Sequence, residues 1–340
     1  MNDSTPSIAT PFTTHAGVEV PLICGPMYPC SNPELVSAVS ESGALGVVQP
    51  VSLTFVHGYD FREGLRLIRS QTSKPIAMNA LIEKSSQKYH QRMQAWVDIA
   101  LEEGVRFFIT SLGNPRWVVD VVTPHGGIVY HDATERKWAL KALDNGVHGL
   151  IGVNNRAGGH AGAKSAEQLM DELGYLNVPL VCAGGIGDEQ QYVQAMQLGY
   201  AGCQLGTRFI ATHECNSALP YKQAIIHADE SDIVLSERIT GVPVSLINTP
   251  QVARKGLKAG PFARWLLGGN RSKHWMRLFY TLRSAFALRS ASLDESGKED
   301  FWQAGKSVGG IHAIESVDDI VKRFKIAWLQ MKRGMGESDG

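Results

Sequence analysis

The chain has 340 residues, of which 44% are hydrophobic and 19% charged, and its formal net charge is zero. This is an ordinary globular composition, and the balanced charge, with no apolar stretch of about 20 residues, excludes a nucleic-acid signature or a membrane span for the molecule as a whole. Five cysteines without a CxxC pair, and an N-terminus without a basic region and an apolar run, predict a cytoplasmic protein that has neither a disulfide framework nor a signal peptide.

Strand-like and helix-like segments alternate over most of the first two thirds of the chain. Short apolar runs predict strands at residues 22–24, 44–48, 75–81, 105–110, 127–131, 149–153, 179–183 and 202–205. Helical patterns lie between them, the first one capped by Asn32 with Pro33 at its first position. Eight strands, each followed by a helix or helical turn, predict an α/β fold, the (β/α)8 TIM barrel. An open doubly wound sheet is the alternative.

The pattern changes after residue 235. No Asp or Glu occurs between Arg238 and Leu293, and aromatic and aliphatic residues are interleaved with the basic ones, which are Arg238, Arg254, Lys255, Lys258, Arg264, Arg271, Lys273, Arg277, Arg283 and Arg289. We therefore expect residues 1–235 and 300–340 to form the barrel with a closing segment, and residues 236–299 to form a basic, mostly helical insertion or lid. Such a segment fits a partner that carries phosphates or acidic residues, although we favour a solvated helical hairpin.

One histidine stands in a glycine-rich loop directly after the sixth predicted strand. The loop, residues 152–162, contains His160 between Gly159 and Gly162. Loops at the carboxyl ends of barrel strands form the active face, and the ordinary pKa of histidine, near 6.5, suits a general acid or base at neutral pH. The alternative is a surface or core histidine without a catalytic role; we interpret His160 as the catalytic residue.

Glycines also follow the seventh and eighth predicted strands. Gly184, Gly185, Gly206 and Thr207 offer backbone N–H groups and a hydroxyl to an anion, as in the phosphate grip of TIM barrels, although tight turns without a ligand remain the alternative. Asn79 could bind a flat heterocycle at the barrel rim or merely cap the following helix. The sequence contains no metal-ligand spacing, Walker loop, GxGxxG unit or GxSxG elbow, so we predict no metal.

Together these motifs resemble the nitronate monooxygenase family, formerly called 2-nitropropane dioxygenases. The similarity runs over residues 21–214 and 303–310 and rests on residues 25–27, Asn79 and residues 157–162, 183–186 and 205–209. It implies an FMN-dependent TIM barrel in which His160 faces the substrate and the flavin contacts are Gly25, Pro26, Met27, Asn79, His131, Gly159, Ala183, Gly184, Gly185, Gly206, Thr207 and Gln303. Two departures are Pro26, where relatives usually have glycine, and His131, where many have lysine.

The resemblance implies an oxidoreductase that oxidises alkyl nitronates or nitroalkanes with O2. An NAD(P)H-dependent flavin reductase of the same superfamily, acting on enoyl thioesters of acyl carrier protein or CoA or on quinones, is the alternative. A non-catalytic flavin-binding module is a third reading. The expected partners are accordingly a small-molecule substrate and O2, with NAD(P)H, an acyl carrier or CoA thioester and a homodimer left open.

Overall fold

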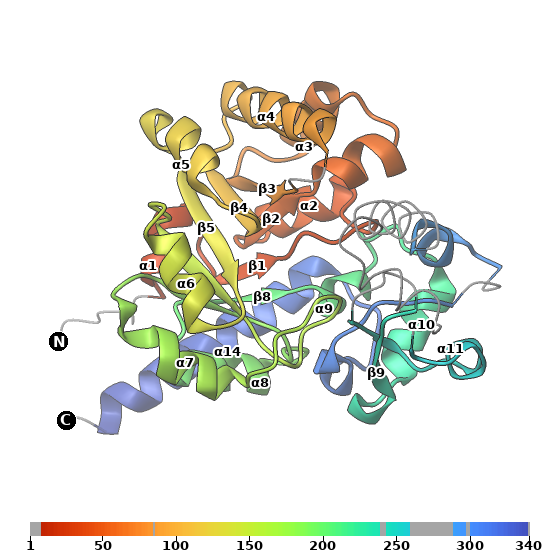
Figure 1. Ribbon diagram of the computed structural model, residues 1–340. Coiled ribbons are helices and arrows are strands. Elements are labelled where there is room, and N and C mark those ends of the chain that lie inside the picture. Colours follow the sequence, from red (N-terminus) through yellow and green to blue (C-terminus); the bar gives the residue numbers. More distant parts are fainter. Residues whose placement is uncertain (1–7, 84–85, 239–242, 259–287, 297–299, 339–340) are drawn as a thin grey trace.

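The computed structural model describes residues 8–338 except 84–85, 239–242, 259–287 and 297–299. Its centre is a closed barrel of eight parallel strands in sequence order, which confirms the TIM barrel (Figure 1). The strands are β1 (Leu22–Cys24), β2 (Leu45–Val48), β3 (Ile76–Ile82), β4 (Phe107–Leu112), β5 (Ile128–Ala133), β6 (Gly149–Val153), β7 (Leu180–Ala183) and β8 (Gly202–Leu205). The barrel closes where β1 pairs with β8, with Ile23 opposite Gln204.

Helices surround the barrel on its outer side (Figure 1). They are α1 (Pro11–Ala16), α2 (Pro33–Glu41), α3 (Phe61–Gln71), α4 (Gln87–Glu102), α5 (Arg116–Val122), α6 (Arg136–Leu143), α7 (Ala166–Leu173), α8 (Glu189–Gln197), α9 (Thr207–Ile210), α10 (Leu219–His227), α11 (Pro250–Lys255) and α14 (Val317–Ser338). Ser165 and Gln168 form a capping box at the start of α7. Asn32 is the N-cap residue of α2 with Pro33 at the first helical position, as predicted, but its side chain makes no cap bond and its amide donates to the Glu34 carboxylate and the Glu214 carbonyl.

Side chains of each strand alternate between two buried layers. The residues that fill the barrel interior include Ile23, Leu45, Val47, Ala77, Phe107, Ile109, Tyr130, Ile151, Val181 and Ala183. Their neighbours in sequence, among them Met78, Phe108, Val129, Leu150 and Cys182, pack outward against the helices. Because side-chain direction has a period of two along a strand, Asn79, Asp132 and Gln204 belong to the inward set at the upper ends of β3, β5 and β8.

The lower end of the barrel is plugged by α1. Phe12 packs edge-on against Phe107, with ring centroids 5.9 Å apart, and against Tyr130 at 6.1 Å. Thr10 Oγ1 donates a hydrogen bond of 2.6 Å to the Ala201 carbonyl. A ligand that enters the barrel must therefore come from the end where the strands finish.

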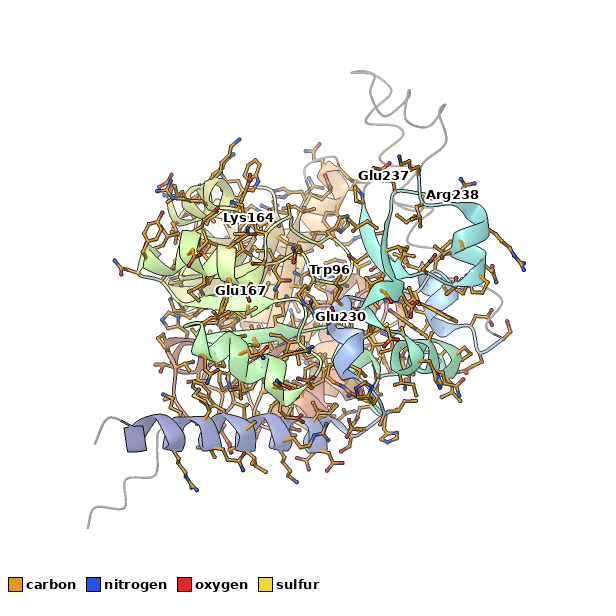
Figure 2. All side chains as sticks on the ribbon, turned by 90° about the horizontal axis from the view of Figure 1, so that it is seen from below. Trp96, Lys164, Glu167, Glu230, Glu237 and Arg238 are labelled. Atoms are coloured by element: carbon orange, nitrogen blue, oxygen red, sulfur yellow. The ribbon has the colours of Figure 1, made fainter. Side chains whose placement is uncertain are left out.

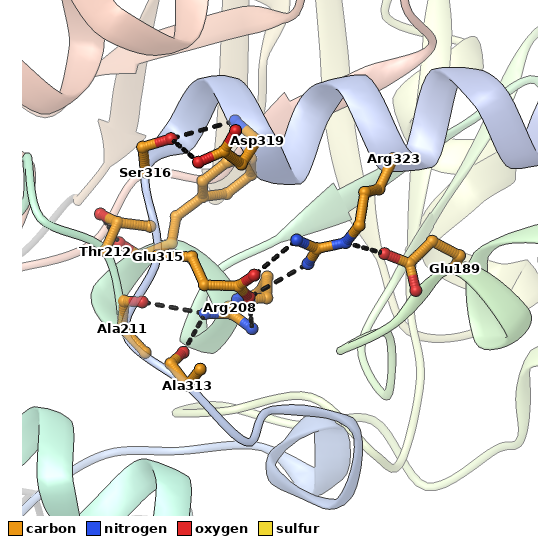
Figure 3. Close-up of polar contacts among 10 residues, drawn as sticks. Glu189, Arg208, Ala211, Thr212, Ala313, Glu315, Ser316, Asp319 and Arg323 are labelled. Carbon is orange, nitrogen blue, oxygen red and sulfur yellow. Dashed lines mark hydrogen bonds and ion pairs between the residues drawn. The ribbon is translucent and has the colours of Figure 1, made fainter.

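The last helix completes the outer layer. α14 runs along one side of the barrel and packs against α8 and α2, so it covers the gap that the short α9 leaves after β8 (Figure 2). Arg208 of the β8–α9 turn is almost fully buried and pairs with Glu315, which also binds Arg323 of α14 (Figure 3). Arg323 in turn pairs with Glu189 at the start of α8. The network explains why an arginine follows Thr207.

The segment after the barrel contains, beside the helix α11, a ribbon that the sequence analysis did not predict. β9 (Ile233–Ser236) and β10 (Val244–Ile247) form an antiparallel ribbon, with Val244 opposite Ser236. The expectation of mostly helical structure missed this ribbon, since such short strands are specified by pairing across the chain rather than by local pattern. Much of the basic 238–293 segment lies outside the described residues. No helix of the described part is long and apolar enough to cross a membrane.

Candidate active site

Asn154 organises the glycine-rich loop after β6. Its side chain is fully buried, accepts a hydrogen bond of 2.8 Å from Arg156 N and donates one of 2.9 Å to the Gly184 carbonyl. Its backbone N–H donates to the Ala183 carbonyl at 3.0 Å. The loop is thereby fixed to the turn after β7. Sequence reasoning missed Asn154, although an amide residue directly after a strand was the available signal.

Gly184 is glycine for reasons of packing. Its φ is +115°, and a Cβ there would overlap Asn154 Oδ1 and lie 2.6 Å from Ala157 N. A side chain at this position would push the β6–α7 loop away from β7. The tight-turn explanation of this glycine therefore holds, whether or not a ligand binds beside it.

The turns after β7 and β8 nevertheless carry free hydrogen-bond donors. In the described part of the chain, no acceptor takes a hydrogen bond from the backbone N–H groups of Gly184, Gly185 or Gly206. Gly185 is buried, and buried N–H groups without a partner are rare in folded proteins. β7 and β8 are neighbours in the barrel, so these donors lie on adjacent turns. The arrangement suits an anion such as a phosphate.

The distant segment around residues 303–310 folds onto the same turns. Gly305 N donates to Thr207 Oγ1 at 3.1 Å, and Lys306 N donates to the Arg156 carbonyl at 2.9 Å. Gly158 packs so closely that a Cβ on it would lie 2.9 Å from Gly305 N. The sequence could not show this contact, which brings Gln303 next to the His160 loop.

His160 lies at the mouth with an exposed side chain. The residue before it, Gly159, has φ +66° and forms a bridge with Ser245 of β10, donating at 3.4 Å and accepting at 2.7 Å. Gln303 Oε1 lies 3.5 Å from the point where a Cβ on Gly159 would stand. Desolvation by the surrounding protein lowers the pKa of His160, so its imidazole is neutral at pH 7.

The turn after β1 meets the turn after β8. Gly25 N donates to the Leu205 carbonyl at 2.9 Å, and a Cβ on Gly206 would lie 3.5 Å from Met27 Sδ. The Met27 carbonyl is held by Ser31 N at 2.9 Å. The structure therefore brings together Gly25, Pro26 and Met27 with Gly206 and Thr207, five of the residues predicted for the cofactor.

Asn79 points into the barrel and is buried. Its amide donates to the Ile109 carbonyl at 3.2 Å. The reading that Asn79 caps the next helix is wrong, because the side chain that caps α4 is Ser86, which accepts from Tyr89 N. Asn79 thus occupies the inward position from which the predicted contact with a flat ring is open.

His131 faces the other way. Its Nδ1 lies 2.8 Å from Thr110 Oγ1, and that hydroxyl donates to the Tyr130 carbonyl at 3.1 Å. The tautomer with the proton on Nδ1 satisfies both contacts, because a hydroxyl that donates to the Tyr130 carbonyl can only accept from His131. Burial lowers the pKa of His131 to about 4. The outward direction differs from the expectation that His131 replaces a flavin-contacting lysine, and its buried bond to Thr110 indicates a structural role.

Two inward residues that the sequence analysis overlooked carry unpaired polar atoms. Asp132 Oδ1 and Gln204 Oε1 are both buried without a hydrogen-bond partner among the described residues. Burial raises the pKa of Asp132 to about 7. Gln204 lies against the β1 turn, its Cγ 3.0 Å from the point where a Cβ on Gly25 would stand. Only the barrel's inward and outward alternation could have singled out these two among many polar residues.

Comparison with known proteins agrees with this arrangement. The profile of a family described as nitronate monooxygenase matches residues 9–325. A Mycobacterium tuberculosis protein named (3aS,4S,5R,7aS)-5-hydroxy-7a-methyl-1-oxo-octahydro-1H-indene-4-carboxyl-CoA dehydrogenase is 24% identical over 87% of this chain and 81% of its own. A probable nitronate monooxygenase of Staphylococcus saprophyticus is 26% identical over 69% of this chain and 78% of its own.

A solved structure has the same fold. FabK from Thermotoga maritima superimposes with a TM-score of 0.78 and 23% identity, over 97% of this chain and 99% of its own. At this identity the likeness supports the barrel with its closing segment and no more.

Proposed function

The chain belongs to the nitronate monooxygenase family and is therefore an oxidoreductase, and we propose that it uses FMN to oxidise alkyl nitronates or nitroalkanes with O2, with His160 as the residue that faces the substrate. The observation that carries this proposal is the placement of His160. An exposed, neutral imidazole stands at the open end of the barrel, in a loop held on one side by β10 and on the other by the turn after β7.

The residues at the mouth fit FMN. The free N–H groups of Gly184, Gly185 and Gly206 suit its phosphate. Gly206 has no side chain where the turns after β1 and β8 meet, which leaves room for the cofactor beside Met27. The unpaired Gln204 Oε1 and the inward Asn79 offer hydrogen bonds to the edge of the ring system. When bound, FMN would accept electrons from the substrate and pass them to oxygen.

His160 can act on this substrate class in two ways. With a nitroalkane, its unprotonated nitrogen can remove the proton from the carbon next to the nitro group. With a nitronate, which has already lost that proton, its N–H can donate a hydrogen bond to an oxygen. The first role needs a neutral imidazole, which the lowered pKa provides at pH 7, and the same neutral ring keeps one N–H for the second role.

A thioester substrate is the second candidate. It is favoured by the two CoA dehydrogenases among the relatives and by exposed cations after the barrel, among them Arg238, Arg254, Lys258 and Arg289. Arg289 reaches the β2 side of the barrel, where its Nη2 lies 3.5 Å from the Val56 carbonyl. Cations near the mouth would suit the phosphates of CoA or of an acyl carrier protein.

Anaerobic mixing separates these functions. The purified FMN-loaded protein is mixed with a secondary alkyl nitronate, and separately with NADH and with NADPH, while flavin absorbance is followed. Rapid bleaching by the nitronate alone is expected. Bleaching by a nicotinamide alone would replace the proposal with the reductase, to be tested with enoyl thioesters and quinones. A protein that neither carries nor takes up FMN would contradict both.

A further inference from the structure

Asp132 is the acidic residue inside the upper half of the barrel. It lies on β5 between His131, which points outward, and Ala133, and it pairs across the sheet with Ile151 of β6. The side chain is partly exposed, whereas its Oδ1 is buried and unpaired. One carboxyl oxygen is thus enclosed in protein, while the residue as a whole still reaches the mouth.

The loop that carries His160 returns to this strand. A Cβ on Gly162 would lie 3.4 Å from Thr134 Cβ, so Gly162, two residues after His160, packs two residues beyond Asp132. β5 and β6 are neighbours in the barrel. Asp132 and the His160 loop therefore border the same part of the mouth.

In the part of the chain that the structure describes, the strands on either side of Asp132 offer no charge to balance an ionised carboxylate. The adjacent strands read FFITSL in β4 and GLIGV in β6 and contain no ionisable residue. The titratable groups on the same strand are Tyr130, which also points inward and whose hydroxyl bonds His15 Nδ1 at 3.0 Å, and His131, whose Nδ1 is held by Thr110 on the outer side. Burial alone shifts Asp132, raising its pKa to about 7.

The pKa of Asp132 is thus raised and that of His160 lowered, each from its usual value. The carboxyl keeps its proton up to about pH 7, while the imidazole loses its own below the usual value of histidine. Two titratable groups whose environments change their proton affinity in this way are the usual mark of an acid and a base in one site.

We propose that Asp132 is a second catalytic residue, a protonated carboxyl that donates a hydrogen bond to the substrate oxygen on which negative charge resides or develops. When His160 takes a proton from carbon, the electron pair of the broken C–H bond moves toward that oxygen, and Asp132 stabilises the resulting anion without transferring its own proton. An anionic nitronate and the enolate of a thioester both present such an oxygen. An ionised Asp132 would repel either one. The inference rests on the proposed function, because it needs a substrate of this charge.

Three variants test the donor. Asp132→Asn keeps a neutral donor of the same shape that cannot ionise, Asp132→Ala removes the donor, and Asp171→Asn, an exposed acid on α7, is the matched control. Turnover of a preformed nitronate is measured with the FMN-loaded enzymes from pH 6 to pH 9. In parallel, the carboxyl carbon of Asp132 is followed by NMR in protein labelled at aspartate and assigned by its loss in Asp132→Asn.

The wild type and Asp171→Asn should lose about fivefold in turnover between pH 7 and pH 8 as Asp132 ionises. Asp132→Asn should hold its rate across this range, and Asp132→Ala should be about 10²-fold slower than the wild type at pH 6, with the difference closing toward pH 9 as the wild type ionises. An Asp132→Asn enzyme that follows the wild-type decline would overturn the inference, even if nitronates are good substrates.

The NMR titration separates failure of the inference from failure of the proposed function. If neither the wild type nor any variant oxidises nitronates, the proposed function is wrong. The carboxyl resonance alone then tests whether Asp132 is protonated in this site. A resonance that titrates near pH 7 supports a protonated Asp132 in this site, whereas a carboxyl already ionised at pH 6 overturns it.

Discussion

The two sides of the barrel mouth are built in opposite ways. On the side of β7 and β8, glycines and the 303–310 segment present mostly backbone groups, and a Cβ on Gly158, Gly184 or Gly305 would overlap neighbouring atoms. On the side of β3 to β6 lie the side chains of Asn79, Asp132 and His160, to which we assign the polar contacts and the chemistry of the proposed function. A substitution on the β7–β8 side is therefore expected to do harm by adding atoms, and one on the β3–β6 side by removing a polar group.

The largest effect, a loss of turnover, is expected on the β3–β6 side of the mouth. His160→Ala should lower turnover by about 10² to 10⁴-fold, because the base or donor is lost, while FMN affinity stays within about twofold. His227→Ala, an exposed histidine at the end of α10, is the control. Steady-state rates and flavin titration measure both quantities. Unchanged turnover in His160→Ala would remove the basis of the proposed mechanism.

A methyl group added to a glycine on the β7–β8 side of the mouth should lower the free energy of unfolding. Gly184→Ala combines a φ of +115° with overlap on Asn154, so we expect a loss of about 2–4 kcal/mol in the free energy of unfolding. Gly104→Ala is the matched control, since its φ is +83° and nothing lies within 4 Å of the added Cβ. Urea unfolding of the two variants isolates the overlap. Equal losses in both would show that the β6–α7 loop yields to the methyl group.

His131 lies on β5, on the same side of the barrel as Asp132, but its side chain points away from the mouth. Its pKa falls from 6.5 to about 4 on folding, so the unfolded chain takes up a proton before the folded protein does. The stability associated with its neutral form is present above pH 6.5 and declines as the pH falls toward 4, by about 3 kcal/mol in total.

His131→Gln should remove this part of the acid sensitivity and leave FMN affinity unchanged. Urea unfolding at pH 7 and at pH 4.5 measures the first effect, with His227→Gln as the control. A large loss of FMN affinity in His131→Gln would instead return this residue to the cofactor site.

The smallest predicted effect is the most specific for the cofactor. Gly206 has an ordinary φ of −109°. A Cβ on it would meet only Met27, whose Sδ would lie 3.5 Å away. Gly206→Ala should therefore unfold like the wild type and bind FMN at least about tenfold more weakly, because the methyl group would occupy space that the cofactor needs. Unchanged FMN affinity would place the phosphate elsewhere.

The barrel could be predicted from the amino-acid sequence alone. Eight apolar runs separated by helical patterns allow few other folds, and their order matched the strands found. The glycine-rich turns and the loop of His160 could be predicted as well, because glycine after a strand and histidine among glycines are local signals. The catalytic candidate and most of the predicted cofactor contacts meet at one end of the barrel for the simple reason that parallel strands end on the same side.

Which side chains share the barrel interior depends on the tertiary structure. The alternation along β5 places Asp132 inside and His131 outside, and a shift of one residue would exchange them. The short β9–β10 ribbon and the return of residues 303–310 to the mouth also depend on contacts between segments far apart in the chain. Local pattern fixes what a residue can do, whereas direction and neighbours, which arise only when the barrel closes, decide whether it does so in the site.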